Sequence, residues 1–565
     1  MLIHRKFNLP TSLYNNYRLY FKYIVSNLHK QDFLNIQCRS SHSAKEKDAH
    51  SIVSLDKTKC NENKAICKNV KLIGWVQSVR KHKSCVFCNI SDGSSPYDLQ
   101  VVTSPSEITD KITVGCALSA EGDIYHIPNV LKTSQLSIDK PTVQCCGELR
   151  AKIVNILDTE NQAGELQLEK SINNVSLPFN HSVPTINQMI SSLGRHSPRP
   201  DLGVLRSVEA LSMRHRLPEF GAMLRMRAYI KRIVRKVMSS CDYLEVDTPI
   251  LTSTDCEGTG QMFQVQAPAL NETRESDSSS IYLTGSAQMH LESLALGLSK
   301  VYTLNPTFRA ENSSTRHHLA EFYMLEAESI YLDNINSLCS EIEMLIKKIL
   351  NECLEIYPIS GCNELNALQN DLVLIRTFLG SQSESDSHSQ SFLVDSALEL
   401  RNVLETMLKQ PFVCISYSEA IEYLNKEMGT ADLTTSKPRD LNKKEEYKIL
   451  DWVGGNRPVF ITRFPMELKP FYCQSINGIE AECADLLFPG IGELVGASVR
   501  ENVASRLQTR MKSNQSQWYI NLRGTGSAPH AGFGLGFERL MQFVLGIANI
   551  RDAIAFPRNA NKIIF

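Results

Sequence analysis

The sequence predicts an α+β protein in which a small β-barrel precedes a larger domain of strands and helices. Three observations predict this organisation: short alternating apolar and polar segments over residues 68–170, helical spacing of apolar residues over 223–238, and two strands flanking a polar loop over 301–328. Because a chain of 565 residues is too long for a single hydrophobic core, two or three domains are expected.

The first of these regions has the pattern of short, half-buried strands. Residues 71–79, 86–90 and 99–102 alternate apolar and polar side chains, and Asp92 and Gly93 fit a tight turn between two of them. About five such strands in about 100 residues are typical of a small barrel. Residues 181–205 are rich in His, Ser, Pro and Gly, which indicates a linker.

The larger region contains three segments with helical spacing. Over residues 223–238 the apolar side chains recur so that they share one broad helix face, while 342–356 and 397–408 fit amphipathic helices that pack against a core. Residues 271–280 and 380–390 are polar or serine-rich, and we expect both to be insertions without a chemical role.

Overall composition excludes several classes of protein. Hydrophobic content of 42% and charged content of 21% are ordinary for a globular chain, and no run approaches the length of a transmembrane helix, so no membrane association is predicted. The net charge of −1 means that any nucleic acid must meet a local basic patch. The sixteen cysteines form no framework, which suits a reducing compartment, and the lone Cys85–Cys88 pair fits a short strand better than a metal site.

The first residues differ in kind from the rest. Residues 1–44 contain six lysines and arginines and one acid, Asp32, with apolar and aromatic residues between them. This is the composition of a transit peptide, so we expect residues 1–50 to target the mitochondrial matrix. The alternative is a basic tail that aids RNA binding in the cytoplasm.

Residues 301–328 are the most informative stretch. Arg309 and Glu311 are two residues apart, so on a strand they would point to the same face. A guanidinium beside a carboxylate suits a nucleotide, because the cation can bind a phosphate oxygen and the acid can accept from donors on the base or ribose.

A glycine-rich stretch at residues 532–539 complements it. The glycines would let a flat ligand lie against the backbone of a strand, and a helix beginning near Phe537 would carry Arg539 toward a second phosphate. The GxGxG spacing is not that of a dinucleotide-binding fingerprint, and no βαβ unit surrounds it.

These two stretches resemble motifs 2 and 3 of the class II aminoacyl-tRNA synthetases that charge aspartate, asparagine and lysine. The runs FRAEN…HLAEF and GFGLGFERL most resemble asparaginyl enzymes, and the resemblance covers residues 68–180 and 205–565. It implies an OB-fold anticodon-binding domain over 68–180 and, over 206–565, a catalytic domain whose antiparallel sheet is flanked by helices. The helix at 223–238 and the strand before Pro249 resemble motif 1, which implies a homodimer.

The resemblance also implies ligands and roles. The substrates would be ATP, asparagine and tRNA(Asn), joined through an asparaginyl-adenylate, with Mg²⁺ as the metal. Arg309 and Arg539 would be the catalytic arginines, with Arg309 bridging the amino-acid carboxylate and the α-phosphate and Arg539 holding the γ-phosphate. The implied ATP-binding residues are Arg309, Glu311, His318, Glu493, Gly536 and Arg539, and the implied metal ligands are Asp485 and Glu493.

One position departs from the family pattern. His317 stands where related enzymes usually carry an arginine, and the neighbouring Arg316 could compensate. The departure leaves open which cation binds the outer phosphates of ATP.

Amino-acid and anticodon contacts are implied in the same way. The amino-acid pocket would comprise Glu257, Gln288, Arg309, Arg500 and His530, and the anticodon would be read by Arg80, Phe87 and Gln100. Leu291 would select asparagine, because aspartate-type enzymes carry a lysine there and an aspartate side chain would lack that countercharge. The alternatives are an aspartyl-tRNA synthetase and a non-catalytic, synthetase-like RNA-binding protein.

Overall fold

We describe the protein from a computed structural model. The described residues are 65, 67–125, 145–157, 199–256, 261–266, 280–312, 315–359, 365–380, 397–428, 438–454, 457–511, 517–526 and 528–559. The expected transit segment lies outside these residues, as do nearly all of the two expected insertions and most of the expected linker.

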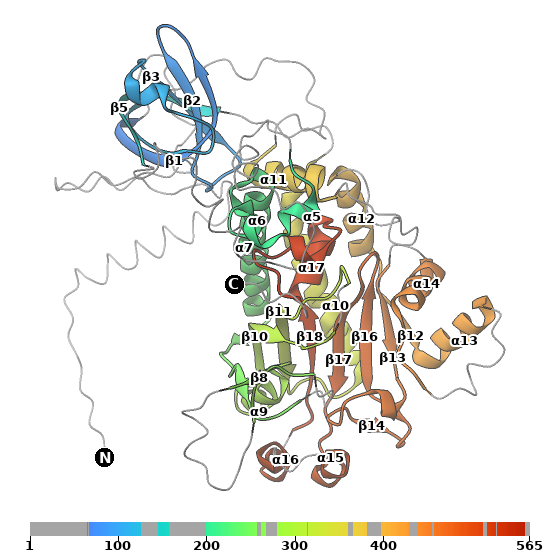
Figure 1. Cartoon of the computed structure of the whole chain (residues 1–565). Coiled ribbons are helices and arrows are strands. Elements are labelled where there is room, and N and C mark those ends of the chain that lie inside the picture. Colours follow the sequence, from blue (N-terminus) through green and yellow to red (C-terminus); the bar gives the residue numbers. More distant parts are fainter. Residues whose placement is uncertain are drawn as a thin grey trace, which may run out of the picture.

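The N-terminal strands close into a five-stranded barrel in the order β1-β2-β3-β5-β4, shown in blue in Figure 1. Along β2 the side chains of Val86, Cys88 and Ile90 enter the barrel core, while Phe87 and Asn89 face outward, as the period of a strand requires. The turn after β2 contains Gly93 at a φ of +76°, a conformation that glycine adopts readily. The barrel elements are β1 (Cys67–Lys81), β2 (Val86–Ser91), β3 (Asp98–Thr103), the short helix α2 (Glu107–Asp110), β4 (Ala117–Tyr125) and β5 (Cys145–Ile156).

The larger part of the protein is built on an eight-stranded sheet in the order β12-β13-β16-β17-β18-β11-β10-β6. Neighbouring strands are antiparallel except for the pairs β12–β13 and β10–β6 at the two edges. The predicted α+β fold is therefore confirmed. The strands are β6 (Leu244–Glu245), β10 (Lys300–Phe308), β11 (Glu321–Ser329), β12 (Val413–Ser416), β13 (Val459–Thr462), β16 (Cys483–Phe488), β17 (Gly492–Val499) and β18 (Ala531–Gly536).

Helices cover one face of this sheet and form the main hydrophobic core with it. The helices are α7 (Pro218–Ser240), α10 (Ile335–Glu352), α12 (Ala397–Lys409) and α17 (Phe537–Leu545). Strand β11 shows the division: Leu325 and Ala327 belong to this core, while Met324, Glu326 and Glu328 face a cavity on the other side. Along β11, residues that face the core thus alternate with residues that face the cavity.

The predicted helices are present, with bounds that local chemistry explains. Helix α7 is longer than expected because Pro218 starts it, at a position where a missing N–H costs nothing. Helix α10 begins before residue 342 because the side chain of Asn334 caps it, accepting from Ser337 N at 2.9 Å.

Shorter elements complete the fold. No helix in the described part of the chain is both long and apolar enough to span a bilayer. The remaining elements are α5 (Leu202–Leu205), α6 (Val208–Leu211), η2 (Arg214–Arg216), β7 (Leu251–Thr252), β8 (Gln264–Val265), β9 (Ile281–Leu283), α9 (Gln288–Leu298), η3 (Cys353–Ile356), α11 (Ala367–Ile375), η4 (Arg376–Gly380), α13 (Tyr417–Met428), α14 (Lys443–Gly454), η5 (Met466–Leu468), β14 (Ser475–Ile476), β15 (Glu480–Ala481), α15 (Ala504–Arg510), α16 (Gln517–Gly524) and η7 (Ile550–Asp552).

Two arginines join the barrel to the sheet domain. Arg225 of α7 donates to the carbonyl of Gly93 at 2.8 Å and forms a two-bond ion pair with Asp371 of α11. Arg216 donates to the carbonyl of Gly115 at 2.7 Å. These contacts hold the barrel beside the helical end of the larger domain (Figure 1).

Candidate active site

A cavity of about 380 Å³ lies on the polar face of the sheet. Its floor is formed by β11, β16, β17 and β18. Its walls include α9, the loops after β10 and before β11, residues 469–473 and the first turn of α17. The side chains that line it include six acids, three arginines, a lysine and two histidines: Glu311, Glu326, Glu328, Asp485, Glu493, Glu538, Arg309, Arg500, Arg539, Lys469, His317 and His318.

Arg309 and Glu311 both line the cavity, but not for the reason expected. Strand β10 ends at Phe308, so both residues lie in the loop that follows and strand alternation does not place them. Instead, the amide of Arg309 donates to the carbonyl of Ala320 at 3.0 Å, which fixes the loop against the start of β11. The Arg309 guanidinium lies 5.5 Å from the centre of the Phe322 ring, which also lines the cavity.

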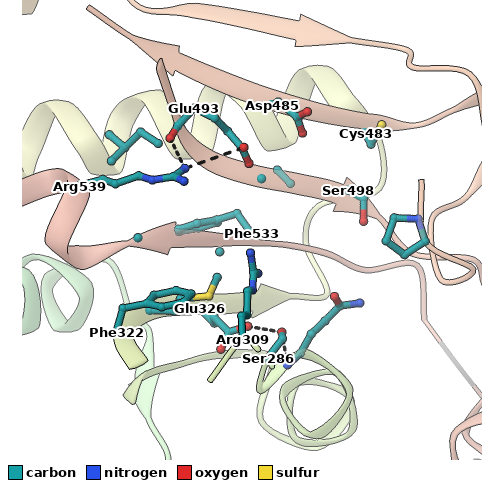
Figure 2. A pocket seen from close by; sticks show the side chains of 18 of the residues that line it. Ser286, Arg309, Phe322, Glu326, Cys483, Asp485, Glu493, Ser498, Phe533 and Arg539 are labelled. Carbon is teal, nitrogen blue, oxygen red and sulfur yellow. Dashed lines mark hydrogen bonds and ion pairs between the residues drawn. The ribbon is translucent and has the colours of Figure 1, made fainter. Parts of the chain in front are cut away.

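Arg539 enters the cavity from the first turn of α17, which begins at Phe537 as predicted. It donates to the carbonyl of Glu493 at 2.6 Å, and its guanidinium lies 3.9 Å from the Glu493 carboxylate (Figure 2). The helix start is anchored by Glu538, which accepts from Arg227 at 2.6 Å and from the amide of Tyr323 at 2.9 Å. The cation is therefore held by a rigid helix end.

Close neighbours leave no room for a side chain at two positions of β18, and both positions are glycine. A Cβ on Gly532 would lie 2.1 Å from the Glu328 carboxylate, and one on Gly534 would lie 2.5 Å from the end of Met324. Gly534 and Gly536 both line the cavity, so the bare backbone forms its floor, as the glycine pattern indicated.

His317 and His318 also line the cavity, near Arg539. Burial, followed by the charges of Lys443, Arg316 and Arg539, lowers the pKa of His317 to about 3. His318 has its Nδ1 2.6 Å from the hydroxyl of Thr315, and burial with the Arg539 charge lowers its pKa as well. Both imidazoles are thus neutral at physiological pH.

The two expected metal ligands lie on neighbouring strands and both line the cavity. Asp485 of β16 forms an ion pair with Lys469 at 2.7 Å, and Glu493 of β17 is held near Arg539. Among the described residues, no group of three or more His, Cys, Asp or Glu side chains is arranged to hold a metal. Two carboxylates fit Mg²⁺ only where phosphate oxygens and water supply its other ligands.

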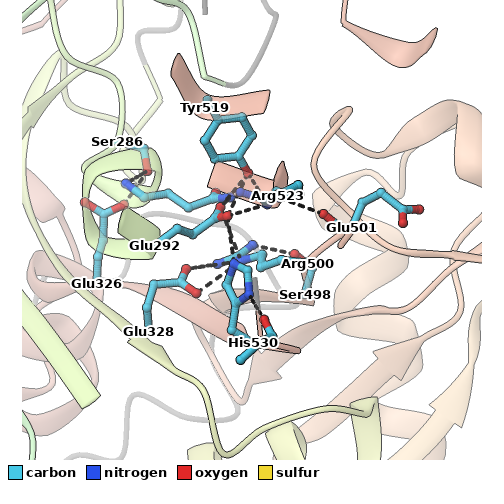
Figure 3. Close-up of polar contacts among 12 residues, drawn as sticks. Ser286, Glu292, Glu326, Glu328, Ser498, Arg500, Glu501, Tyr519, Arg523 and His530 are labelled. Carbon is cyan, nitrogen blue, oxygen red and sulfur yellow. Dashed lines mark hydrogen bonds and ion pairs between the residues drawn. The ribbon is translucent and has the colours of Figure 1, made fainter. Parts of the chain in front are cut away.

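At the other end of the cavity, a buried arginine is paired with acids. Arg500, at the end of β17, forms an ion pair with Glu328 and hydrogen-bonds to the hydroxyl of Ser498 (Figure 3). It also lies 3.9 Å from Glu292. Arg500, Glu328 and Ser498 line the cavity together with Gln288, whose amide donates to Glu292 at 2.8 Å.

Glu292 of α9 is the centre of a buried network behind this wall (Figure 3). It accepts from Arg523 at 2.7 Å, from the Tyr519 hydroxyl at 2.8 Å and from His530 at 3.0 Å. Burial alone would raise the pKa of Glu292, but His530, Arg523 and Arg500 together lower it below its usual value. The carboxylate is therefore ionised and fixed.

His530 does not reach the cavity, contrary to the expectation that it contacts the amino acid. It lies just before β18, and its ring is fully buried between Glu292 and the carbonyl of Ala528, 2.8 Å from Nδ1. The ring therefore bridges the Glu292 carboxylate and the backbone before β18. His530 orients Glu292 instead of touching a ligand in the cavity.

Leu291 also fails to face the cavity, and the argument that it selects the amino acid directly is wrong. It is fully buried in an apolar cluster with Ala287, Ala295 and Val301. Adjacent residues of a helix differ by about 100° in direction, so Leu291 points into the core while Glu292 joins the polar network.

We expect Leu291→Lys to destabilise the protein instead of changing its amino-acid preference. The substitution would bury an ammonium without a partner, which costs several kcal/mol, whereas Leu291→Met conserves volume and should cost less than about 1.5 kcal/mol. Urea unfolding of both variants checks this. A stable Leu291→Lys variant that activates aspartate would restore the original interpretation.

The expected anticodon residues form one outward patch on the barrel. Arg80 pairs with Phe87 across β1 and β2, and Gln100 of β3 pairs with Asn89, so the four side chains share a face. Arg80 is exposed, and Phe87 and Gln100 are half-buried. The patch is accessible to a ligand, and its role stays a prediction.

Glu257, which was expected in the amino-acid pocket, lies outside the described residues. Glu292, Glu326 and Glu328 were not assigned, although acids within apolar strand and helix patterns could have indicated them. Glu326 accepts from the amide of Ala287 at 2.9 Å and from the hydroxyl of Ser286, so it fixes the start of α9 at the cavity wall.

Comparisons with known proteins show the family of this chain. The family described as tRNA synthetases class II (D, K and N) matches residues 207–560. The chain is 32% identical to an asparaginyl-tRNA synthetase of Mus musculus, covering 86% of this chain and 90% of that one. It is also 32% identical to the mitochondrial asparagine–tRNA ligase of Saccharomyces cerevisiae, covering 88% and 93%.

The fold has solved counterparts. The crystal structure of asparaginyl-tRNA synthetase from Pyrococcus horikoshii with asparaginyl-adenylate superposes with a TM-score of 0.64 at 23% identity, covering 92% of this chain and all of that one. With the family match and the sequence identities, this gives the assignment: the chain belongs to the class II tRNA synthetases of the D, K and N group, and among them to the asparaginyl-tRNA synthetases.

Proposed function

We propose that this protein attaches asparagine to tRNA(Asn) in two steps within this cavity. In the first step the asparagine carboxylate attacks the α-phosphorus of ATP and pyrophosphate leaves. In the second, a hydroxyl of the terminal ribose of the tRNA attacks the carbonyl of the adenylate and AMP leaves. The single observation that carries the proposal is one cavity with Arg309 and Arg539 at its nucleotide side and the paired Arg500 at its other end.

Positioning and charge are what the first step requires of the protein. The substrates bring their own nucleophile and leaving group, so fixed cations beside the reacting phosphorus supply most of the catalysis. Arg309 would bridge the carboxylate and the α-phosphate, Arg539 would hold the γ-phosphate, and Glu311 would accept from the adenosine. Phe322 and the bare β18 backbone provide surfaces for the flat base.

The charge balance at Arg500 favours asparagine over aspartate. Glu328 already neutralises this guanidinium and Glu292 lies nearby, so a side-chain carboxylate would meet two buried acids. An amide adds no charge, and it can accept from Arg500 while donating to an acid. The preference for asparagine would therefore come from Arg500 and its two acids and not from Leu291.

Mg²⁺ would be held by Asp485 and Glu493 together with the phosphates of ATP. Hard carboxylate oxygens suit this ion, and both side chains line the cavity on adjacent strands. When bound, the ion would neutralise charge on the phosphates. Because Lys469 already pairs with Asp485, it would share that carboxylate with the ion.

A pyrophosphate-exchange assay tests the proposal. The full chain with ATP and Mg²⁺ should exchange labelled pyrophosphate into ATP when asparagine is added, at least about 100-fold better than with aspartate. Preference for aspartate would make the protein an aspartyl enzyme. Folded protein that binds RNA but shows no exchange with either amino acid would make it a non-catalytic RNA-binding protein.

The barrel and the sheet edge suggest the partners. The patch of Arg80, Phe87 and Gln100 would contact the anticodon, with Phe87 offering a ring for a base to stack on. Strand β6 ends the sheet and contains Leu244, and Leu251 lies in the short strand β7 that follows in the chain. Both side chains are more than half exposed, which supports a homodimer through this region. A monomeric mass in sedimentation would contradict the dimer.

We also propose a mitochondrial site of action. The basic, acid-poor composition of residues 1–44 supports it, as does the mitochondrial relative from yeast. Residues 1–50 fused to a fluorescent protein should direct it to mitochondria, and diffuse cytoplasmic fluorescence would favour the basic-tail alternative.

A further inference from the structure

Lys443 lies beside the start of β17, next to the nucleotide end of the cavity, on an element to which the sequence assigned no role. It is the first residue of α14, and its ammonium lies 3.0 Å from the Glu446 carboxylate. The same Glu446 oxygen accepts from the amide of Glu493 at 2.9 Å. A Cβ on Gly492 would lie 2.3 Å from the Lys443 nitrogen, so the ammonium packs directly against the start of β17.

Lys443 and Arg539 therefore approach the same short piece of backbone from different elements. Arg539 donates to the carbonyl of Glu493 at 2.6 Å, while Glu446, the partner of Lys443, holds the amide of that residue. Glu493 and Arg539 both line the cavity. Lys443 does not itself line the cavity, but it lies beside Gly492 and next to Glu493, which does.

The position of Lys443 is electrostatically unfavourable without a ligand. A cation in the first turn of a helix opposes the helix dipole. Burial, and also the charge of Arg539, lowers the pKa of Lys443, although Glu446 opposes the shift. A polyanion at this end would offset both costs, since its charge would be shared by the two cations.

His317 cannot supply this charge itself. Its ring lines the same end of the cavity, and its Nδ1 is buried with no hydrogen-bond partner in the described part of the chain. Burial, followed by the charges of Lys443, Arg316 and Arg539, lowers the pKa of the imidazole, so it offers a hydrogen bond and no charge. The positive charge at this end comes from lysine and arginine.

We propose that Lys443 binds the outer phosphates of ATP beside Arg539 and supplies the cation that position 317 lacks in this chain. The inference rests on the proposed function, because it assigns a residue to the ATP-binding end of that site. Arg539 and Lys443 would share the phosphate charge, and His317 would add a hydrogen bond.

The test is Lys443→Met in the full chain, assayed by asparagine-dependent pyrophosphate exchange. Losing one charge-assisted contact should raise the KM for ATP about tenfold or more and leave the KM for asparagine within about twofold. The matched control is Lys444→Met, which removes an exposed lysine from the next position of the same helix. Lys443→Arg should keep the KM for ATP near that of the unchanged protein.

A rescue variant separates phosphate binding from a packing role. Adding His317→Arg to Lys443→Met restores a cation at the same end and should recover most of the lost ATP affinity. An unchanged KM for ATP in Lys443→Met, an equal rise in both KM values, or failure of both Lys443→Arg and the rescue would overturn the inference. Absence of exchange in the unchanged protein would instead contradict the proposed function.

Discussion

Arg309→Ala should lower the rate of asparagine-dependent pyrophosphate exchange by about 10³-fold, with Arg309→Lys recovering only part of the loss. Removing one preorganised donor from a developing oxyanion typically costs about 10²- to 10³-fold, and Arg309 would contact both reacting groups. Lysine keeps the charge but not the planar two-pronged donor set, so about 10²-fold should remain lost. Steady-state exchange kinetics measure both effects.

The control for this prediction is Arg506→Ala, which removes an exposed arginine from α15. Its exchange rate should equal that of the unchanged protein. Thermal unfolding of the Arg309 variants should stay close to normal, because Arg309 fixes its loop through its backbone amide. If Arg309→Ala kept more than about a tenth of the activity, the assignment of the α-phosphate to this side of the cavity would be wrong.

Arg500→Met should abolish asparagine activation and destabilise the fold. The substitution leaves Glu328 buried without its cation and removes a neighbour of Glu292, and breaking a buried ion pair typically costs about 3–5 kcal/mol of unfolding free energy. Chemical denaturation measures the stability, and exchange at saturating ATP measures the loss of asparagine use. We expect the loss to exceed about 10²-fold.

A double variant distinguishes recognition from stability. Replacing the pair together, as Arg500→Met with Glu328→Met, removes both charges and should return most of the lost unfolding free energy, because an apolar pair of similar volume is tolerated in a core. Asparagine activation should stay lost, since neither side chain could then bond the amide. Recovery of activity along with stability would show that Arg500 only supports the fold.

Much of the fold and of the nucleotide end of the cavity could be predicted from the sequence, because short local patterns indicate them. Strand alternation indicated the barrel, and the helix at residues 223–238 followed from apolar spacing. The glycines of β18 and the arginine at the start of α17 were visible as a short run, and the structure brings Arg309, Glu311 and Arg539 into one cavity. Strand alternation, the expected reason for Arg309 and Glu311 to lie together, does not apply, because both residues lie beyond the end of β10.

The order and type of the elements, the family, and the two arginines of the nucleotide end could thus be read from local sequence patterns. The direction of side chains whose environment comes from distant elements became clear only from the folded arrangement. Leu291 and Glu292 are neighbours in sequence, yet one enters an apolar cluster and the other meets Arg523, Tyr519 and His530 from more than two hundred residues away.

The positions of the acids of β11 and of Lys443 also depend on elements that are distant in the sequence. Strand alternation separates Glu326 and Glu328 from Leu325 and Ala327, but only the packing of helices on one face shows which set lines the cavity. Lys443 lies far along the chain from Glu493 and Arg539, and the sheet brings α14 to them. Local pattern fixes periodicity, whereas charge pairing and burial depend on contacts that form only when the chain has folded.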